Sequence, residues 1–150
     1  RSRTFNAGFA TLRQVHFAIT DLRLHSRWSS AGGVTPDQLR RDIAANTTVI
    51  PPIEDDQFLC AFGHIFAGGY SAGYYSYKWA EVLSADAFAA FEEVGLEDED
   101  QIRATGARFR DTVLSLGGSQ SPEAVFQAFR GREASSDALI RHSGLTPAAA

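Results

Sequence analysis

All four tyrosines of the chain lie in one short segment, residues 70–77, next to a histidine and two glycines. Tyr70, Tyr74 and Tyr77 stand at positions i, i+4 and i+7, a spacing that places three phenols on one face of a helix. Tyr75 would point about 100° away from Tyr74. Such a row of phenols is either a packed aromatic seam or a row of hydrogen-bond donors directed into a cleft.

The general expectation for these residue types is structural. Aromatic residues at helical spacing usually belong to a core, and a single histidine such as His64 is usually a core residue bonded to the backbone. Two features favour a cleft instead. Three buried phenols would each need a hydrogen-bond partner, which a dry core rarely supplies. The adjacent Gly68 and Gly69 give a backbone that can move or approach a ligand closely.

A row of phenols beside a cleft can do specific chemistry. A phenol aligned with a reacting carbonyl donates to the oxyanion that develops during acyl transfer, and losing one such donor costs roughly 10²–10³ in rate. A phenol can also hold a peptide carbonyl in the ground state. Ser71 and Ser76 have no evident Ser–His–Asp arrangement, which argues against a serine hydrolase. A nucleophile or a metal would have to come from outside these residues.

The other possible metal ligands form no recognisable site. The four histidines include no pair at the i, i+4 spacing of a zinc-binding helix and no His-Glu-x-x-His motif. We expect packed or surface roles for His16 and His25, and a contact of His142 with the C-terminal dipole of the last helix. Cys60 cannot form an internal disulfide or a thiolate site by itself, and we expect an inert buried thiol.

Composition excludes several partners. The chain has 14 lysines and arginines against 18 aspartates and glutamates, a net charge of −4, and no basic block. Nucleic acid is therefore not an expected partner. No apolar run approaches membrane-spanning length, so no membrane contact is expected. The single cysteine fits a reducing compartment, and we expect a cytoplasmic protein, with an organelle as the alternative.

The sequence also suggests a piece of a longer protein. It has no methionine, not even at position 1, and it begins directly with helical periodicity. A processed mature protein is the alternative interpretation.

Apolar residues recur at helical spacing through most of the chain, without β-alternation or an internal repeat. The expected inner face of the first helix carries Phe5, Phe9, Leu12, Val15 or His16, Ile19 and Leu22. Further helices are expected after Thr35, from about Ser71 to Glu93 with a bend or break near residues 84–86, after residues 97–100, after Ser121 and from about Ser136. The pattern predicts an all-α fold in which residues 1–150 form one compact unit of roughly five to seven helices.

One segment resembles a known family. Residues 62–91, which begin Phe-Gly-His-Ile-Phe-Ala-Gly-Gly-Tyr-Ser-Ala-Gly-Tyr-Tyr-Ser-Tyr-Lys-Trp, closely resemble the C-terminal catalytic region of the thimet oligopeptidase family, nearest to the oligopeptidase A type. Residues 9–25 are similar to the family's preceding helix. Residues 117–119, 129–133 and 144–145 resemble its closing segment, with one departure at Ala134, where the family pattern leads us to expect proline.

The resemblance implies part of a larger, mostly helical zinc metallopeptidase with a deep channel for short peptides. Family members hold one zinc ion through two histidines and a glutamate, and a second glutamate activates water. The His-Glu-x-x-His helix should lie upstream of Arg1. This chain would then be the C-terminal part of the catalytic domain. It would bind no zinc and cleave no peptide alone, and the remainder of the peptidase would be its partner.

The resemblance also assigns roles to individual residues. By matching position, the catalytic residues are His64 and Tyr70, facing the substrate near the zinc, and Tyr77, which would polarise the scissile carbonyl and stabilise the oxyanion.

Three further residues would bind substrate. Tyr74 would contact the peptide, and Gly68 and Gly69 would form a flexible loop that closes over it. The competing hypothesis is a non-catalytic helical binding or regulatory module that retains the fold without the chemistry.

Overall fold

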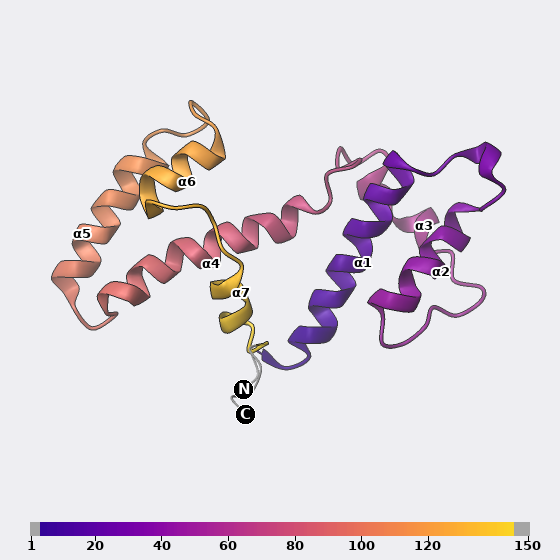
Figure 1. Ribbon diagram of the computed structural model, residues 1–150, viewed down its shortest axis with the longest axis horizontal. Coiled ribbons are helices and arrows are strands. Elements are labelled where there is room, and N and C mark those ends of the chain that lie inside the picture. The colour runs from indigo at the N-terminus through magenta and orange to yellow at the C-terminus, as the bar shows by residue number, and fades with distance from the viewer. Residues whose placement is uncertain (1–3, 146–150) are drawn as a thin grey trace. The chain divides into compact units, whose positions relative to one another are not determined.

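The computed structural model describes residues 4–145 (Figure 1). Within this range the chain forms helices and turns and no strand, which confirms the expected all-α fold. The chain divides between Lys78 and Trp79 into two compact units, and each is described by itself. That residues 1–150 belong to one catalytic domain stays a prediction.

The first unit is built on two helices that lie side by side, α1 (Ala7–Ser26) and α2 (Pro36–Thr47) (Figure 1). The remaining elements of this unit are short: η2 (Ser30–Gly32), α3 (Phe58–Ala61) and η3 (Gly63–Ile65). The start of α2 is the expected one. The Thr35 side-chain oxygen accepts a hydrogen bond of 3.1 Å from the Gln38 backbone N–H, and so satisfies one of the free donors of the first turn.

The buried face of α1 differs from the expected inner face and shares only His16 with it. Its buried residues are His16, Phe17, Thr20 and Asp21. The expected inner residues that are instead exposed are Phe5, Phe9, Leu12 and Leu22. Polar side chains can be buried here because each finds a partner. For example, His16 Nδ1 lies 2.9 Å from Thr47 Oγ1, and the Thr20 hydroxyl donates to the His16 carbonyl at 2.7 Å.

Aromatic rings dominate the core of the first unit. Its buried residues are Phe17, Leu59, Phe62, Ile65 and Tyr74. Phe58 stacks on Phe17 with 4.8 Å between ring centroids, and Phe62 packs against both. Cys60, on α3, is exposed, so the expectation of a buried thiol is wrong. Its neighbour Leu59 is the buried residue of that short helix.

The remaining elements are α4 (Ser76–Val94), α5 (Glu99–Phe109), η4 (Arg110–Leu114), α6 (Pro122–Arg130) and α7 (Asp137–His142). The side chain of Asp98 caps α5 and that of Ser121 caps α6. Val125, Phe126 and Phe129 of α6 are buried. Within the described range no helix is long and apolar enough to cross a membrane.

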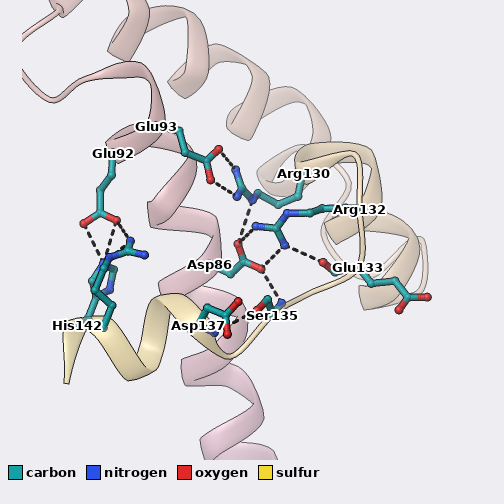
Figure 2. A network of polar contacts seen from close by, with 10 residues as sticks. Asp86, Glu92, Glu93, Arg130, Arg132, Glu133, Ser135, Asp137 and His142 are labelled. Atoms are coloured by element: carbon teal, nitrogen blue, oxygen red, sulfur yellow. Dashed lines mark hydrogen bonds and ion pairs between the residues drawn. The ribbon is translucent and has the colours of Figure 1, made fainter. Parts of the chain in front are cut away.

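The expected break in α4 near residues 84–86 is absent, because Asp86 is satisfied from outside the helix. Asp86 is buried and accepts hydrogen bonds from the side chains of Arg130 and Arg132 and from the Ser135 backbone (Figure 2). Arg130 also forms a two-bond pair with Glu93. This polar network ties α4 to the end of α6 and to the segment that leads into α7.

Candidate active site

The loop that carries His64 closes tightly on itself. The Tyr70 backbone N–H donates to the His64 carbonyl at 3.0 Å, and the Gly68 N–H donates to the Gly63 carbonyl at 2.9 Å. A Cβ atom at Gly68 would lie only 2.7 Å from the His64 Cα, so this position requires glycine. Gly69 has φ +83°, a left-handed conformation that glycine adopts without strain.

The three tyrosines do not share one face of a helix. Helix α4 begins at Ser76, and residues 71–75 form successive turns, with the Gly73 N–H bonded to the Tyr70 carbonyl at 2.8 Å. The expected helix from Ser71 is therefore wrong over its first turn. The rings nevertheless meet. Tyr77 stacks on Tyr70 with 5.0 Å between ring centroids and lies 5.1 Å from Tyr74.

His64 joins the same cluster of rings. Its imidazole centroid lies 6.1 Å from the ring of Tyr70 and 6.1 Å from that of Tyr74. The structure therefore brings together the four aromatic side chains that the sequence singles out. We call His64, Tyr70, Tyr74 and Tyr77 the tyrosine cluster. All of them belong to the first unit.

Tyr74 is the buried member of the cluster. Its ring packs edge-on against Phe17 and Phe62, and its hydroxyl donates to Gln14 Oε1 at 3.1 Å. Burial raises the pKa of Tyr74, with an opposing effect from the charge of Arg13. Within this chain Tyr74 is a packed residue whose phenol already has a partner. Its role as a substrate contact stays a prediction.

Tyr77 is the exposed tyrosine of the cluster, with 40% of its surface exposed, and His64 is exposed as well. A hydrogen bond with Tyr70 raises the pKa of Tyr77, and burial and the neighbouring phenols act in the same direction. A phenol whose pKa lies above its usual value of about 10 stays protonated at neutral pH. Tyr77 is therefore equipped to donate a hydrogen bond and not to act as a base. Tyr75 is exposed on the same turn.

Two residues of α1 bind the tyrosine segment, and sequence reasoning missed both. Gln14 accepts the Tyr74 hydroxyl. Asp21 is completely buried, and its two carboxylate oxygens accept the backbone N–H groups of Ala72 and Tyr74, each at 2.9 Å. Both of these backbone donors lie more than 50 residues from Asp21 along the chain. Helical periodicity places Gln14 and Asp21 on a solvent face and cannot reveal such contacts.

Among residues 4–145 no group of three histidine, cysteine, aspartate or glutamate side chains is placed to hold a metal ion. His16 bonds Thr47, and His25 lies 2.8 Å from an oxygen of Asp21. His142 sits 2.9 Å from Glu92, so its partner is a carboxylate on α4 and not only a helix dipole. The hydrogen bond from His142 is the main reason that the pKa of Glu92 is lowered.

Comparison with known families decides the kinship. Residues 1–145 match Peptidase family M3. The chain belongs to this peptidase family. The three relatives described next cover nearly all of this chain. The kinship with oligopeptidase A that the tyrosine segment indicated is confirmed by them.

Three M3 relatives illustrate the similarity. Probable cytosolic oligopeptidase A of Arabidopsis thaliana is 55% identical over 149 residues, which are 99% of this chain and 21% of the relative. The organellar (chloroplastic/mitochondrial) oligopeptidase A of the same plant is 54% identical over 99% of this chain and 19% of the relative. Oligopeptidase A of Escherichia coli K12 is 43% identical over 144 residues, 96% of this chain and 21% of the relative. The chain spans about a fifth of the length of these M3 peptidases.

Proposed function

We propose that residues 1–150 form the C-terminal part of the catalytic domain of a zinc-dependent oligopeptidase that hydrolyses short peptides. In this proposal the chain supplies substrate-binding and oxyanion-stabilising groups. Membership of peptidase family M3 and the relatives named oligopeptidase A support a peptidase. The observation that carries the assignment of the site is an exposed Tyr77 that stacks on Tyr70 and lies beside Tyr74 of the tyrosine cluster.

The proposed catalytic residues act through hydrogen bonding. The Tyr77 hydroxyl turns from Tyr70 to the substrate and donates to the oxygen that becomes negative as the scissile carbonyl is attacked. Tyr70 keeps the Tyr77 ring in place by stacking and is free to bind the same peptide group once its partner turns away. His64, held through its carbonyl by the Tyr70 N–H, provides a further polar contact to the substrate.

The proposed substrate-binding residues are Tyr74, Gly68 and Gly69. The left-handed backbone of Gly69 and the open space around it suit a loop that closes over a peptide. Gly68 is more constrained because it packs against the His64 backbone, so closure would move the two residues together. Tyr74 would reach substrate only by releasing Gln14.

Residues 4–145 include no group of three side chains placed to hold zinc. In the intact peptidase, zinc and the attacking nucleophile would be held by residues outside this chain, and the chain alone would bind no zinc and cleave no peptide. Relatives named cytosolic and organellar support a cytoplasmic or organellar location. The proposed partners are short peptides and the remainder of the peptidase, and neither nucleic acid nor a membrane.

One observation favours a second candidate, a non-catalytic helical binding or regulatory module. The Tyr74 phenol is buried and already bonded to Gln14, as in a packed aromatic seam. If the whole cluster served that purpose, its hydroxyls would contribute to stability and not to turnover.

Kinetics of two tyrosine variants in the intact peptidase separate these candidates. Tyr77→Phe keeps the ring stacking and removes one hydroxyl. We expect kcat and kcat/KM to fall together by roughly 10²–10³ with KM little changed, as for loss of one oxyanion donor. Tyr75→Phe is the matched control on the same turn and should cost far less. Bound zinc is measured in both variants. Equal, mild effects would favour the non-catalytic module.

A further inference from the structure

We propose that Asp21 is the positioning residue of the tyrosine cluster: its buried carboxylate holds the turn at residues 71–75 in the shape that brings Tyr77 onto Tyr70. This inference rests on the proposed function for its catalytic consequence. It adds a residue on another helix, and that residue does not touch substrate.

The contact is a carboxylate enclosed by backbone donors. Oδ1 of Asp21 accepts the Ala72 N–H and Oδ2 accepts the Tyr74 N–H, each at 2.9 Å. Alternate amides of one turn thus converge on a single anion, as in other backbone anion sites, and hydrogen bonds to an ionised acceptor are the stronger kind. His25 Nδ1 is a further polar neighbour of the carboxylate and lies 2.8 Å from Oδ1. Asp21 is completely buried, so it can act only through its neighbours.

The turn needs such support because its backbone is in a disfavoured conformation. Ala72 has φ +55°, in the left-handed region that residues with a Cβ atom rarely adopt. The N–H of this same residue is one of the two that Asp21 accepts. Without the carboxylate, Ala72 would be free to return to an ordinary helical or extended conformation. The turn would then lose its shape.

The shape of the turn sets the position of Tyr77. Asp21 holds the Tyr74 backbone while Gln14 holds the Tyr74 hydroxyl, so this residue is attached to α1 at both ends. The Tyr74 carbonyl in turn accepts the Tyr77 N–H at 3.3 Å, and their rings lie 5.1 Å apart. Asp21 is thereby linked through Tyr74 to the phenol that is proposed to donate to the oxyanion.

A double-mutant cycle in the intact peptidase tests this link. In Asp21→Asn one oxygen is replaced by an NH₂ group that cannot accept an N–H. Because small misplacements of reacting groups are costly, we expect kcat to fall about 10–100-fold, with a smaller change in KM. In a Tyr77→Phe background, Asp21→Asn should cost less than about 3-fold, since the hydroxyl that it positions is already absent.

The matched control is Asp86→Asn. Asp86 is also a buried carboxylate that accepts a backbone N–H, that of Ser135, but it lies in the second unit. The Asp86→Asn substitution should lower the melting temperature, while the folded enzyme keeps kcat within about 3-fold of the parent. If Asp21→Asn does not fold, Asp21→Asn/Ala72→Gly takes its place, because glycine removes the strain of the positive φ but, being more flexible, does not hold the turn in that shape. A folded double variant with reduced kcat supports the inference, and parental kcat overturns it.

Two results would contradict the inference. One is an equal loss of kcat from Asp21→Asn in both backgrounds. The other is a lowered melting temperature for Asp21→Asn with kcat within about 3-fold of the parent, as expected for Asp86→Asn. A crystal structure of the Asp21→Asn variant adds a readout independent of catalysis, in which the Tyr74–Tyr77 and Tyr70–Tyr77 ring separations should change. Unchanged rings overturn the positioning role. If the rings are displaced in the variant but the parental protein cleaves no peptide, the positioning role of Asp21 is supported and the proposed function is overturned.

Discussion

Asp86→Ala is expected to destabilise the second unit by about 3–5 kcal/mol, the cost of removing one partner from a buried ion pair. Asp86 is 1% exposed and accepts hydrogen bonds from Arg130 at 3.2 Å, from Arg132 at 2.6 and 2.7 Å, and from the Ser135 N–H at 2.8 Å (Figure 2). The Arg130 side chain, 5% exposed, is the charge left behind. Because Arg130 keeps two bonds to Glu93, we expect the lower end of the range.

Substitutions of Arg132 and Glu93, which contact this network, should cost less stability because their side chains are more exposed. The Arg132 side chain is 45% exposed and that of Glu93 is 58% exposed. Ion pairs that reach solvent are screened, so Arg132→Ala and Glu93→Gln should each cost about 1 kcal/mol or less. Asp98→Ala is the matched control for an aspartate that only caps a helix, and should cost about 1 kcal/mol.

The effect of Asp86 also has a defined pH dependence. Burial alone would raise its pKa, but the hydrogen bonds from Arg132 and Ser135 and the charges of both arginines hold the pKa of Asp86 below its usual value. A carboxyl with a lowered folded pKa stabilises the fold above its unfolded pKa of about 3.9, and this stability is lost as pH falls through the folded value. The cost of Asp86→Ala should therefore be constant near neutral pH and shrink below about pH 4.

Urea denaturation followed by tryptophan fluorescence measures these costs. Trp28→Phe leaves Trp79, in the second unit, as the one tryptophan of the chain. Free energies of unfolding are compared in this background at constant m-value. A loss below 1 kcal/mol for Asp86→Ala, or one equal to that of Asp98→Ala, would refute the claim that the buried Asp86–Arg130 ion pair is a major contribution to the stability of this unit.

Further predictions concern the first unit. Gly68→Ala places a methyl group 2.7 Å from the His64 Cα, so both the melting temperature and kcat of the intact peptidase should fall. Gly69→Ala has open space but a positive φ, so peptide kinetics should show a higher KM and a lower kcat at a nearly unchanged melting temperature. Burial and two nearby arginines lower the pKa of His16, so the unfolded chain binds more protons than the folded one. Stability should then fall as pH drops below about 6.5, and His16→Gln should flatten this slope in a series of thermal melts.

The sequence predicts well those features that depend on neighbouring residues. Thr35 and Ser121 cap their helices because each bonds a backbone N–H three residues ahead. The last helix, α7, ends at His142 and is followed by Gly144 with a positive φ, and the Leu145 N–H donates to the Ile140 carbonyl, as at other helix-terminating glycines. The kinship with oligopeptidase A could also be predicted from the sequence, because the tyrosine segment is long and specific.

Three of the errors involve contacts between residues that are distant in the sequence. A helix from Ser71 fits the local pattern, but Asp21 takes the N–H groups of residues 72 and 74 that a helix would orient otherwise. The same contact involves a buried charged residue of α1, whereas several apolar residues expected on its inner face are exposed. The break expected near residue 86 likewise disappears because Arg130 and Arg132 satisfy Asp86 from more than 40 residues away.

The most direct test of the central claim is a crystal structure of the intact peptidase with a peptide in which a phosphinate replaces the scissile amide. The distance from the Tyr77 hydroxyl to the nearer phosphinate oxygen is the measurement. The proposed role predicts a hydrogen bond of about 2.5–3.0 Å, with Tyr77 released from Tyr70. A Tyr77 hydroxyl that remains on Tyr70, out of hydrogen-bonding reach of the phosphinate, would contradict it.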